Sequence, residues 1–314
     1  MNKNILITGC NGQIGQELIH SFLAKENIIG LDLNNRPNNK FKFHECDILN
    51  YEKLDCIFKK EKINEVYHLA AYLSAKAEND MTTAWKINMD GLLNILNLCK
   101  KYSIKKVFWP SSIAVFGKDA KKKQTEQNEK LNPNSIYGIT KVLGENLCEY
   151  FFNNHNIDVR SVRFPGLIGY RSMPGGGTTD YAVDIFYSAI NNNTFNCFLN
   201  YDSFLPMMYM DDAIRAIHEI MNADEIKIRK SYNISGCSFS PKEIFNEIKK
   251  YYPNFTINYK PDFRQNLATS WPDSINDSCA YKDWGWKAKF NLNEIVKNML
   301  ENIKTNKKIL KNVE

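Results

Sequence analysis

The feature that most restricts the fold of this chain is a glycine-rich segment near its start, Thr8-Gly9-Cys10-Asn11-Gly12-Gln13-Ile14-Gly15. It follows an apolar run, Asn4–Thr8, that has the composition of a buried strand. Apolar residues at helical spacing come next: Ile14, Leu18 and Phe22. Glycines three residues apart allow a tight strand-to-helix turn and let helix N–H groups face an anion such as a pyrophosphate. The segment therefore predicts a dinucleotide-binding turn, although a plain turn has the same local signature.

Short apolar stretches alternate with longer amphipathic ones through the first half of the chain, which is typical of a parallel sheet covered on both faces. We predict further strands and two helices, in order: Ile28–Asp32, Val66–Ala71, Gly91–Tyr102 (helix), Val107–Pro110, Tyr137–Phe152 (helix) and Val159–Arg163. The polar stretch Lys118–Pro133 is predicted to be a surface loop. The fold class is therefore α/β, a Rossmann-type doubly wound parallel sheet.

The elements become shorter after about residue 165, and Pro174–Gly177 breaks the chain into a loop. One helix is expected near Asp211 and another at Ser240–Glu243, a capping box with proline at the first helical position. A last helix is expected at about Leu292–Ile303. We predict that residues 1–165 form the NAD-binding domain. Residues 166–314 are predicted to form mainly a smaller α/β substrate-binding lobe, interleaved with the first domain and followed by a basic tail.

Charge and cysteine usage narrow the partners and the compartment. The chain has 41 Lys+Arg and 35 Asp+Glu, and much of the excess of six lies in Lys121–Lys123 and Lys304–Lys311. We interpret these runs as a solvated loop and tail, so neither nucleic acid nor membrane is predicted as a partner. The eight cysteines and five histidines show no paired or clustered spacing, which favours a reducing compartment and no metal site. The first strand starts almost at the initiator and leaves no room for a presequence, so a cytoplasmic protein is expected.

Two carboxylates after predicted strands are candidates for binding the cofactor. Asp32 ends the second strand, 17 residues beyond Gly15, where a carboxylate accepts the ribose hydroxyls of NAD and repels the 2′-phosphate of NADP. No arginine adjoins it in the strand, and Arg36 is four residues away. Asp47 is either a partner of the adenine amino group or the cap of a helix at Tyr51–Phe58.

A tyrosine and a lysine one helical turn apart, Tyr137 and Lys141, suggest the chemistry. They follow Ser112, at a predicted strand end, by about 25 residues. A nearby cation lowers the pKa of a phenol, so Tyr137 is a candidate base near neutral pH. Ser112 is a candidate hydrogen-bond donor to the reacting oxygen, and Lys141 a candidate ligand of the nicotinamide ribose.

This combination resembles the extended short-chain dehydrogenase/reductase superfamily. The resemblance implies a Rossmann fold, NAD and hydride transfer, with Ser112, Tyr137 and Lys141 as catalytic residues. It also implies a set of cofactor-binding positions: Gly9, Asn11, Gly12, Gln13, Ile14, Gly15, Asp32, Asp47, Ile48, Leu69, Ala70, Ala71, Asn88, Tyr137, Lys141, Phe164 and Pro165.

Motifs in the second half are more specific: Arg163–Ile168, Pro174–Ala182, Leu205–Tyr209, Ser270–Pro272 and Lys282–Trp286. In this order they are similar to the short-chain type of L-threonine 3-dehydrogenases, over the length from the first strand to about Ile303. That resemblance implies NAD-dependent oxidation of the L-threonine 3-hydroxyl to 2-amino-3-oxobutanoate, with Tyr137 as base. It implies these substrate-binding residues: Ser74, Ser112, Tyr137, Thr178, Thr179 and Trp271.

The sequence also allows two other functions. A nucleotide-sugar epimerase would share the fold, whereas a dehydratase would need an Asp-Glu pair where this chain has Ile113-Ala114. A non-catalytic NAD-sensing module would not need Ser112, Tyr137 and Lys141 together. Analogy with the superfamily also predicts a homodimer through the helices at Gly91–Tyr102 and Tyr137–Phe152, and the triple glycine predicts that Gly175–Asp180 closes over the substrate.

Overall fold

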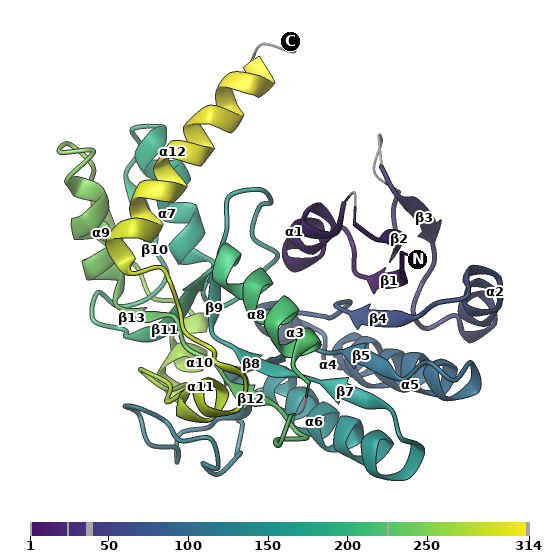
Figure 1. The fold of residues 1–314 in the computed structure, drawn as a ribbon. Coiled ribbons are helices and arrows are strands. Elements are labelled where there is room, and N and C mark those ends of the chain that lie inside the picture. The colour runs from purple at the N-terminus through teal and green to yellow at the C-terminus, as the bar shows by residue number, and fades with distance from the viewer. Residues whose placement is uncertain (1, 24, 36–39, 225, 312–314) are drawn as a thin grey trace.

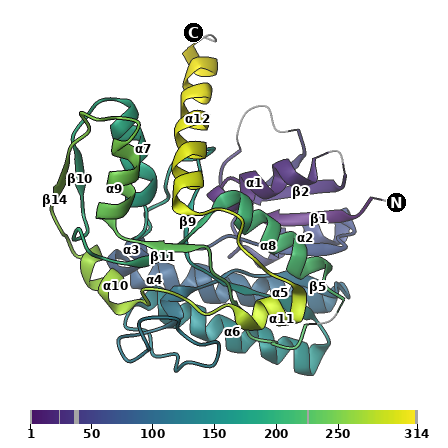
Figure 2. The ribbon, with the colours of Figure 1, turned by 60° about the vertical axis from the view of Figure 1, so that its left-hand side comes forward.

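The structure is a computed structural model that describes residues 2–23, 25–35, 40–224 and 226–311, with side chains of the last helix described as far as residue 305. Arg36, considered above beside Asp32, lies outside the described residues. The chain has a sheet-and-helix part that contains the strands β1 (Asn4–Thr8), β2 (Asn27–Asp32) and β3 (Lys42–Glu45). A second part contains α7 (Tyr181–Ile190), α9 (Pro241–Lys249) and α12 (Leu292–Lys311) and lies on the side away from these strands (Figures 1 and 2).

The main sheet has six parallel strands in the order β3-β2-β1-β4-β5-β7. The strands are β1 (Asn4–Thr8), β2 (Asn27–Asp32), β3 (Lys42–Glu45), β4 (Glu65–His68), β5 (Lys106–Phe108) and β7 (Asp158–Arg160). The order reverses between β1 and β4, so the carboxyl ends of these two strands border the crevice where such sheets bind ligands. The predicted fold class is confirmed.

Helices cover both faces of this sheet, and the alternation of side chains in β1 shows why. Ile5 and Ile7 pack against α1 (Gln13–Phe22) and α8 (Met210–Asn222), whereas Leu6 packs on the other face. That other face is covered by α2 (Tyr51–Glu61), α5 (Gly91–Lys101) and α6 (Ile136–His155). Between β4 and α5 lie α3 (Ser74–Asn79), α4 (Met81–Trp85) and a π-helical turn, Lys86–Asp90.

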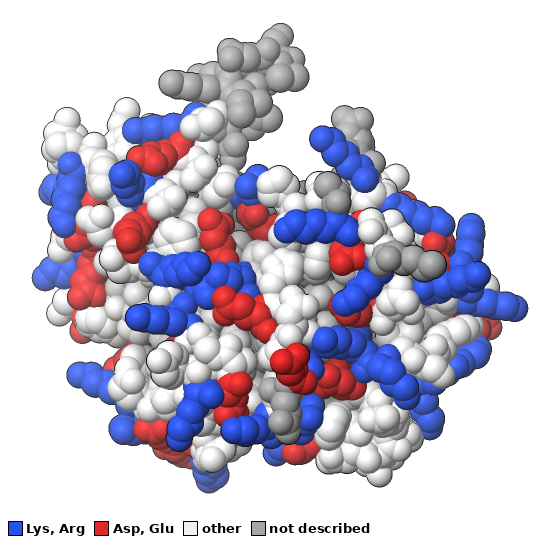
Figure 3. All heavy atoms as spheres, in the orientation of Figure 1, with Lys and Arg blue, Asp and Glu red and all other residues white. Residues whose placement is uncertain are grey.

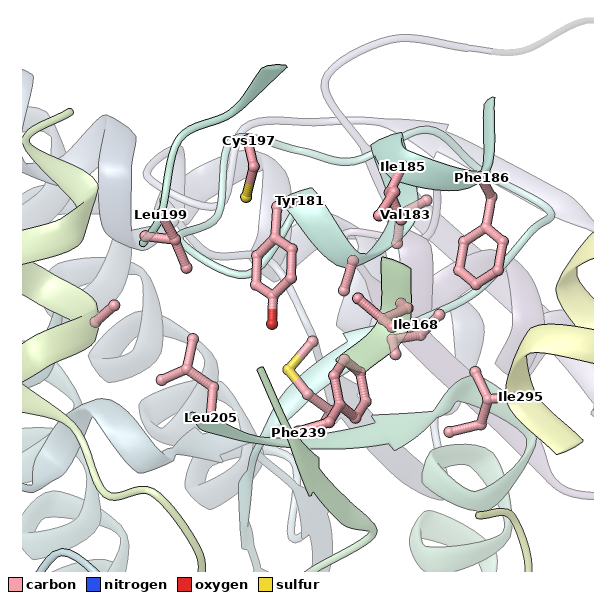
Figure 4. Packing of buried hydrophobic residues seen from close by; sticks show 14 of the residues in the cluster. Ile168, Tyr181, Val183, Ile185, Phe186, Cys197, Leu199, Leu205, Phe239 and Ile295 are labelled. Atoms are coloured by element: carbon pink, nitrogen blue, oxygen red, sulfur yellow. The ribbon is translucent and has the colours of Figure 1, made fainter. Parts of the chain in front are cut away.

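The second part has its own core between short strands and the helices α7 (Tyr181–Ile190), α9 (Pro241–Lys249), α10 (Arg264–Ser270) and α12 (Leu292–Lys311). Its strands are β9 (Gly166–Ile168), β10 (Phe195–Cys197), β11 (Leu205–Tyr209), β13 (Cys237–Phe239) and β14 (Ile257–Tyr259). Tyr181 points its ring among Leu199, Leu205 and Phe239 (Figure 4), and its buried hydroxyl has no hydrogen-bond partner among the described residues.

A further three-stranded sheet, β12-β8-β6, pairs strands from both halves of the sequence, and Val162, Phe164 and Tyr232 of this sheet pack in the core that contains Ile5 and Ile7. It contains β6 (Ser111–Ser112), β8 (Val162–Phe164) and β12 (Tyr232–Asn233). The single strand predicted at Val159–Arg163 is therefore two strands in different sheets, because the chain leaves the main sheet at Ser161. The α11 helix (Ser278–Trp284) packs beside β12.

Other differences from the sequence predictions are at element ends. The strand predicted to reach Ala71 ends at His68, and the last helix continues from Leu292 to Lys311, through the residues interpreted as a tail. The capping box is confirmed: the Ser240 hydroxyl accepts from the Glu243 N–H, and the Glu243 carboxylate accepts from the Ser240 N–H.

Basic and acidic side chains are interspersed over the face shown in Figure 3. The eight cysteines, all within the described residues, form no disulfide bond; Cys56 on α2 is exposed, Cys237 and Cys279 are half-buried and the other five are buried. Across the described part of the chain, we find no helix with the length and apolar character that a bilayer crossing needs.

Candidate active site

A cavity of about 890 Å³ lies at the carboxyl ends of β1 and β4 and extends to the second part of the molecule. Its lining contains all the residues predicted to bind cofactor or substrate except Asn88. It includes the glycine turn, Asp32 and Asp47 at one end and Ser74, Thr178, Thr179 and Trp271 at the other. Ser112, Tyr137 and Lys141 also belong to this lining, so one space brings together three predicted groups of residues that are far apart in sequence.

The glycine turn has the shape that a bound pyrophosphate requires. Gly9 has φ +67°, and a Cβ there would lie 2.7 Å from the Ala70 backbone nitrogen. A Cβ at Gly15 would overlap the Gly9 carbonyl. Gly12 is the N-cap of α1, and among the described residues no side chain caps this helix, so its first N–H groups are available to an anion. The turn therefore fits the phosphates of a dinucleotide.

The two carboxylates differ in what holds them. Asp32 accepts from the N–H of Asn11 at 2.8 Å and of Leu33 at 2.8 Å, which fixes its carboxylate beside the glycine turn. Asp47 accepts from the N–H of Leu49 at 2.9 Å. The cap of α2 is Asn50, whose side chain accepts from the Lys53 N–H, so Asp47 is not the helix cap that its position in the sequence also allowed.

Tyr137 and Lys141 share a face of α6 opposite Ser112. The Ser112 side chain accepts from the Ala114 N–H at 3.2 Å, and its interaction with the Tyr137 hydroxyl lowers the pKa of that phenol. Lys141 donates to the Pro110 carbonyl at 2.6 Å, and its Nζ lies 4.5 Å from the ring centroid of Trp109. It lies 5.5 Å from the ring centroid of Tyr137.

The protonation states differ from the simplest expectation. Burial raises the pKa of Tyr137 to about 12, and the hydrogen bond with Ser112 offsets this only in part. Burial lowers the pKa of Lys141 to about 8, although Cys148 and Glu145 oppose this shift. The sequence expectation that Lys141 lowers the pKa of the phenol is therefore not met in this structure, because the ammonium is directed to Pro110 and desolvation of Tyr137 dominates.

A buried ionic network lies behind these groups. The Arg163 guanidinium donates to both carboxylate oxygens of Glu145, at 2.9 and 2.8 Å, and neither residue is more than 3% exposed. Ser111 donates to Glu145 at 2.6 Å, and Arg163 also donates to the Gln127 carbonyl and the Asn233 side chain. Because Ser111 precedes Ser112 and Glu145 lies one turn beyond Lys141, the network joins the strand and the helix that carry the candidate catalytic residues.

The far end of the cavity is polar and organised by the glycine-rich loop. The Ser74 and Thr178 hydroxyls are 3.1 Å apart, and the Thr178 N–H donates to Ser74 Oγ at 3.2 Å. Asp180, which we did not single out from the sequence, accepts from the N–H groups of Gly176 and Gly177 at 2.9 and 2.7 Å. Burial raises the pKa of this carboxyl, and the two backbone donors oppose the rise.

Two further positions correct or extend the sequence analysis. Asn88 lies behind the cavity wall, where its side chain exchanges hydrogen bonds with the backbone of Tyr72 and donates to Thr140, so it shapes the wall without lining it. Arg171, also missed, lines the cavity and forms an ion pair with Glu17 of α1 at 2.8 Å. Its only sequence signal was an isolated arginine in a glycine-rich stretch. Among the described residues, no group of three or more His, Cys, Asp or Glu side chains is arranged to hold a metal ion.

Comparison with known proteins gives the class of the molecule. A family model described as the NAD dependent epimerase/dehydratase family matches residues 5–235. An uncharacterised epimerase/dehydratase of Staphylococcus haemolyticus is 42% identical over 311 residues, covering 96% of this chain and 98% of the relative. Fold and cavity define a dinucleotide-binding α/β enzyme, and the chain belongs to the NAD-dependent epimerase/dehydratase family, with NAD as its cofactor.

The solved structures that it resembles are more specific. A monomeric L-threonine 3-dehydrogenase from a metagenome, in its apo form, is 47% identical with a TM-score of 0.93, covering 96% of this chain and 99% of that one. The holo form of an L-threonine dehydrogenase from Cupriavidus necator is 46% identical with a TM-score of 0.92 and the same coverage. A UDP-glucose 4-epimerase from Thermotoga maritima, at 23% identity and a TM-score of 0.86, shares the fold.

Proposed function

We propose that the protein oxidises the 3-hydroxyl of L-threonine with NAD⁺ to give 2-amino-3-oxobutanoate. The observation that carries the proposal is the similarity to threonine dehydrogenases over nearly the whole of both chains, including the part that forms the far end of the cavity. The polar groups at that end, with Ser74 and Thr178 in contact, suit the amino and carboxylate groups of an amino acid. We propose that Thr179 and Trp271 complete this subsite, with Trp271 over the methyl group.

The cofactor is proposed to lie along the cavity from the glycine turn to Tyr137. Gly9–Gly15 would hold the pyrophosphate, Asp32 the adenosine ribose and Asp47 with Ile48 the adenine. Leu69–Ala71, Phe164 and Pro165 would form the walls toward the nicotinamide. When bound, NAD⁺ supplies the hydride acceptor and a positive ring charge.

Tyr137 is proposed to take the proton from the hydroxyl oxygen as the hydride leaves the carbon that bears this hydroxyl, so that the C–O bond becomes a carbonyl. Ser112, which lines the same cavity as Tyr137, would donate to the substrate oxygen as negative charge develops on it. Lys141 would exchange its bond with the Pro110 carbonyl for the cofactor's ribose and so move its charge toward the phenol. A cation near the phenol lowers its pKa from about 12, so the rate should rise with pH through the alkaline range.

The test is NADH absorbance with NAD⁺ and L-threonine, beside NADP⁺, L-serine, D-threonine and UDP-glucose. Tyr137→Phe should lose at least about 10²-fold in kcat while NAD⁺ affinity is kept, since general-base catalysis is worth about 10²–10⁴-fold. Tyr281→Phe, an exposed tyrosine of α11 outside the cavity lining, is the matched control. Epimerisation of UDP-glucose without threonine turnover would refute the proposal and support a nucleotide-sugar epimerase. NAD⁺ binding without any turnover would support the sensing module.

We propose that residues 1–165 bind mainly NAD and that residues 166–314 bind mainly the substrate.

We also propose a homodimer through α5 and α6, because their outer faces expose large apolar side chains: Leu93, Ile139, Leu143 and Tyr150. A similar threonine dehydrogenase is described as monomeric, so the oligomeric state of this protein has to be measured. Light scattering measures it directly, and a monomer at micromolar concentration would refute the dimer. Cysteines without disulfide bonds support a reducing, cytoplasmic setting.

A further inference from the structure

One lysine of the basic run Lys121–Lys123 has an internal function. Lys121 and Lys123 are exposed, whereas Lys122 is half-buried. Its Nζ donates to the Trp271 carbonyl at 2.6 Å and to the Thr269 carbonyl. Burial lowers the pKa of Lys122, since the ammonium has exchanged part of its water for these carbonyls. The interpretation of the whole run as a solvated loop is therefore wrong for its central residue.

The carbonyls that Lys122 contacts lie at the carboxyl end of α10, where helical carbonyls lack partners within the helix. A cation is favourable at that end because the helix dipole is negative there. Ser270 Oγ donates to the Leu267 carbonyl and the Trp271 N–H donates to the Ala268 carbonyl. Lys122 thus completes the cap of a short helix and holds the residue that directly follows it.

The backbone on the other side of Trp271 is tied to the same loop. The Asp273 N–H donates to the Lys122 carbonyl at 2.8 Å, and the Thr125 N–H donates to the Ser274 carbonyl at 2.9 Å. The Asn276 N–H donates to the Thr125 carbonyl at 3.0 Å. Residues 122–125 therefore fix the path of the chain both before and after the tryptophan.

The loop that holds Trp271 also connects two candidate catalytic residues. Ser112 lies shortly before Lys118–Pro133, and Tyr137 lies in the first turn of the helix that follows it. Trp271 is 4% exposed and lines the cavity that contains Ser112 and Tyr137. One segment thus sets the position of the tryptophan relative to the reacting groups.

We propose that Lys122 is a positioning residue that holds Trp271 at a fixed distance from Ser112 and Tyr137, and so selects the size of the substituent on the reacting carbon. The proposal rests on the proposed function, in which that substituent is the methyl group of L-threonine. A gap of about 0.5–1 Å between apolar atoms forfeits a quarter to a half of their attraction. A small displacement of the indole is therefore enough to weaken the preference for L-threonine over L-serine, which lacks the methyl group.

The variant that isolates this function is Lys122→Met, which keeps most of the aliphatic stem and removes the donor. We expect a higher KM for L-threonine and an unchanged NAD⁺ affinity. The ratio of kcat/KM for L-threonine to that for L-serine should fall about tenfold, which lies within the range of about 10- to 200-fold that one methylene is worth in an apolar pocket. Lys121→Met makes the same charge change at an exposed neighbour and should behave as the wild type. Lys122→Arg, which keeps the donors, should restore most of the preference.

The outcomes separate this proposal from the proposed function. Wild-type protein without threonine turnover overturns both. Wild-type turnover with an unchanged threonine preference in Lys122→Met overturns only the positioning function, even if the variant is less stable to urea. If Lys122→Met does not fold, Lys122→Gln, which keeps one donor group, is measured instead. Its preference for L-threonine over L-serine should also fall, but by less than the loss expected for Lys122→Met. Trp271→Leu should lose the same preference, and adding Lys122→Met to it should have little further effect on that ratio.

Discussion

The buried pair of Glu145 and Arg163 permits a quantitative prediction. Arg163→Met removes the guanidinium and leaves the Glu145 carboxylate, which is fully buried, with Ser111 as its remaining donor in the network. Removing one partner of a buried ion pair costs about 3–5 kcal/mol, because the other charge stays desolvated. Whole domains have only about 5–15 kcal/mol of stability, so the loss is a large share of the total.

The expected change in melting temperature follows from the size of the chain. Unfolding entropy is about 2.1 cal/mol/K per residue, so 314 residues give roughly 0.66 kcal/mol/K and the substitution lowers Tm by about 5–8 °C. Urea unfolding followed by far-UV circular dichroism measures the same loss as a free energy. The control is Glu145→Leu combined with Arg163→Met, which leaves neither charge buried and should recover at least about 1 kcal/mol relative to the sum of the single changes.

Two results would refute the reasoning about this pair. One is an Arg163→Met protein within about 1 kcal/mol of the wild type, which would mean that the carboxylate is not held desolvated. The other is a double variant as unstable as the sum of the single variants, which would mean that the charges do not interact. Through Ser111 the network also joins the strand of Ser112 to the helix of Tyr137 and Lys141, so the double variant should lose kcat even where its stability has recovered.

Three other predictions follow from the cavity. Gly9→Ala should cost about 1–3 kcal/mol of stability and weaken NAD⁺ binding, because its φ is +67° and a Cβ would contact Ala70; equal NAD⁺ affinity by titration would contradict this. The pKa of Lys141 falls on folding from 10.5 to about 8, so burying its charge lowers the stability of the wild type below about pH 8, and this loss disappears as the pH rises toward 10.5. The stability of Lys141→Met relative to wild type should therefore decline between about pH 8 and 10.5 in urea titrations. A stability difference that does not change with pH would contradict the burial of the Lys141 charge. Hydrogen exchange in Gly175–Asp180 should slow when NAD⁺ and L-threonine are both added, and unchanged exchange would exclude a closing loop.

Patterns with a local cause were predictable from the sequence. The glycine turn, the strand before it and the capping box at Ser240 depend on residues within a few positions of each other, and each has the predicted place. The choice of Ser112, Tyr137 and Lys141 came from spacing and from the family resemblance, and the structure brings them to one cavity.

Features that depend on contacts distant in sequence were not predictable. The division of Val159–Arg163 between two sheets depends on pairing of β8 with β12, some 70 residues away. The use of Lys122 depends on the end of a helix nearly 150 residues further along. The direction of the Tyr137 pKa depends on how deeply the phenol is buried and where the lysine points, and neither is encoded in a four-residue spacing.

Because the cysteines differ in burial, the rate at which each thiol reacts with a reagent should report local unfolding around it. In the native protein a thiol reagent should modify Cys56 first and the half-buried Cys237 and Cys279 more slowly, while complete unfolding exposes all eight. Buried Cys10 lies within the glycine turn and lines no open surface, so its labelling rate would record how often that turn opens. Peptide mapping by mass spectrometry would measure the labelling rate at each cysteine. These rates would compare local unfolding at the different sites without an engineered label.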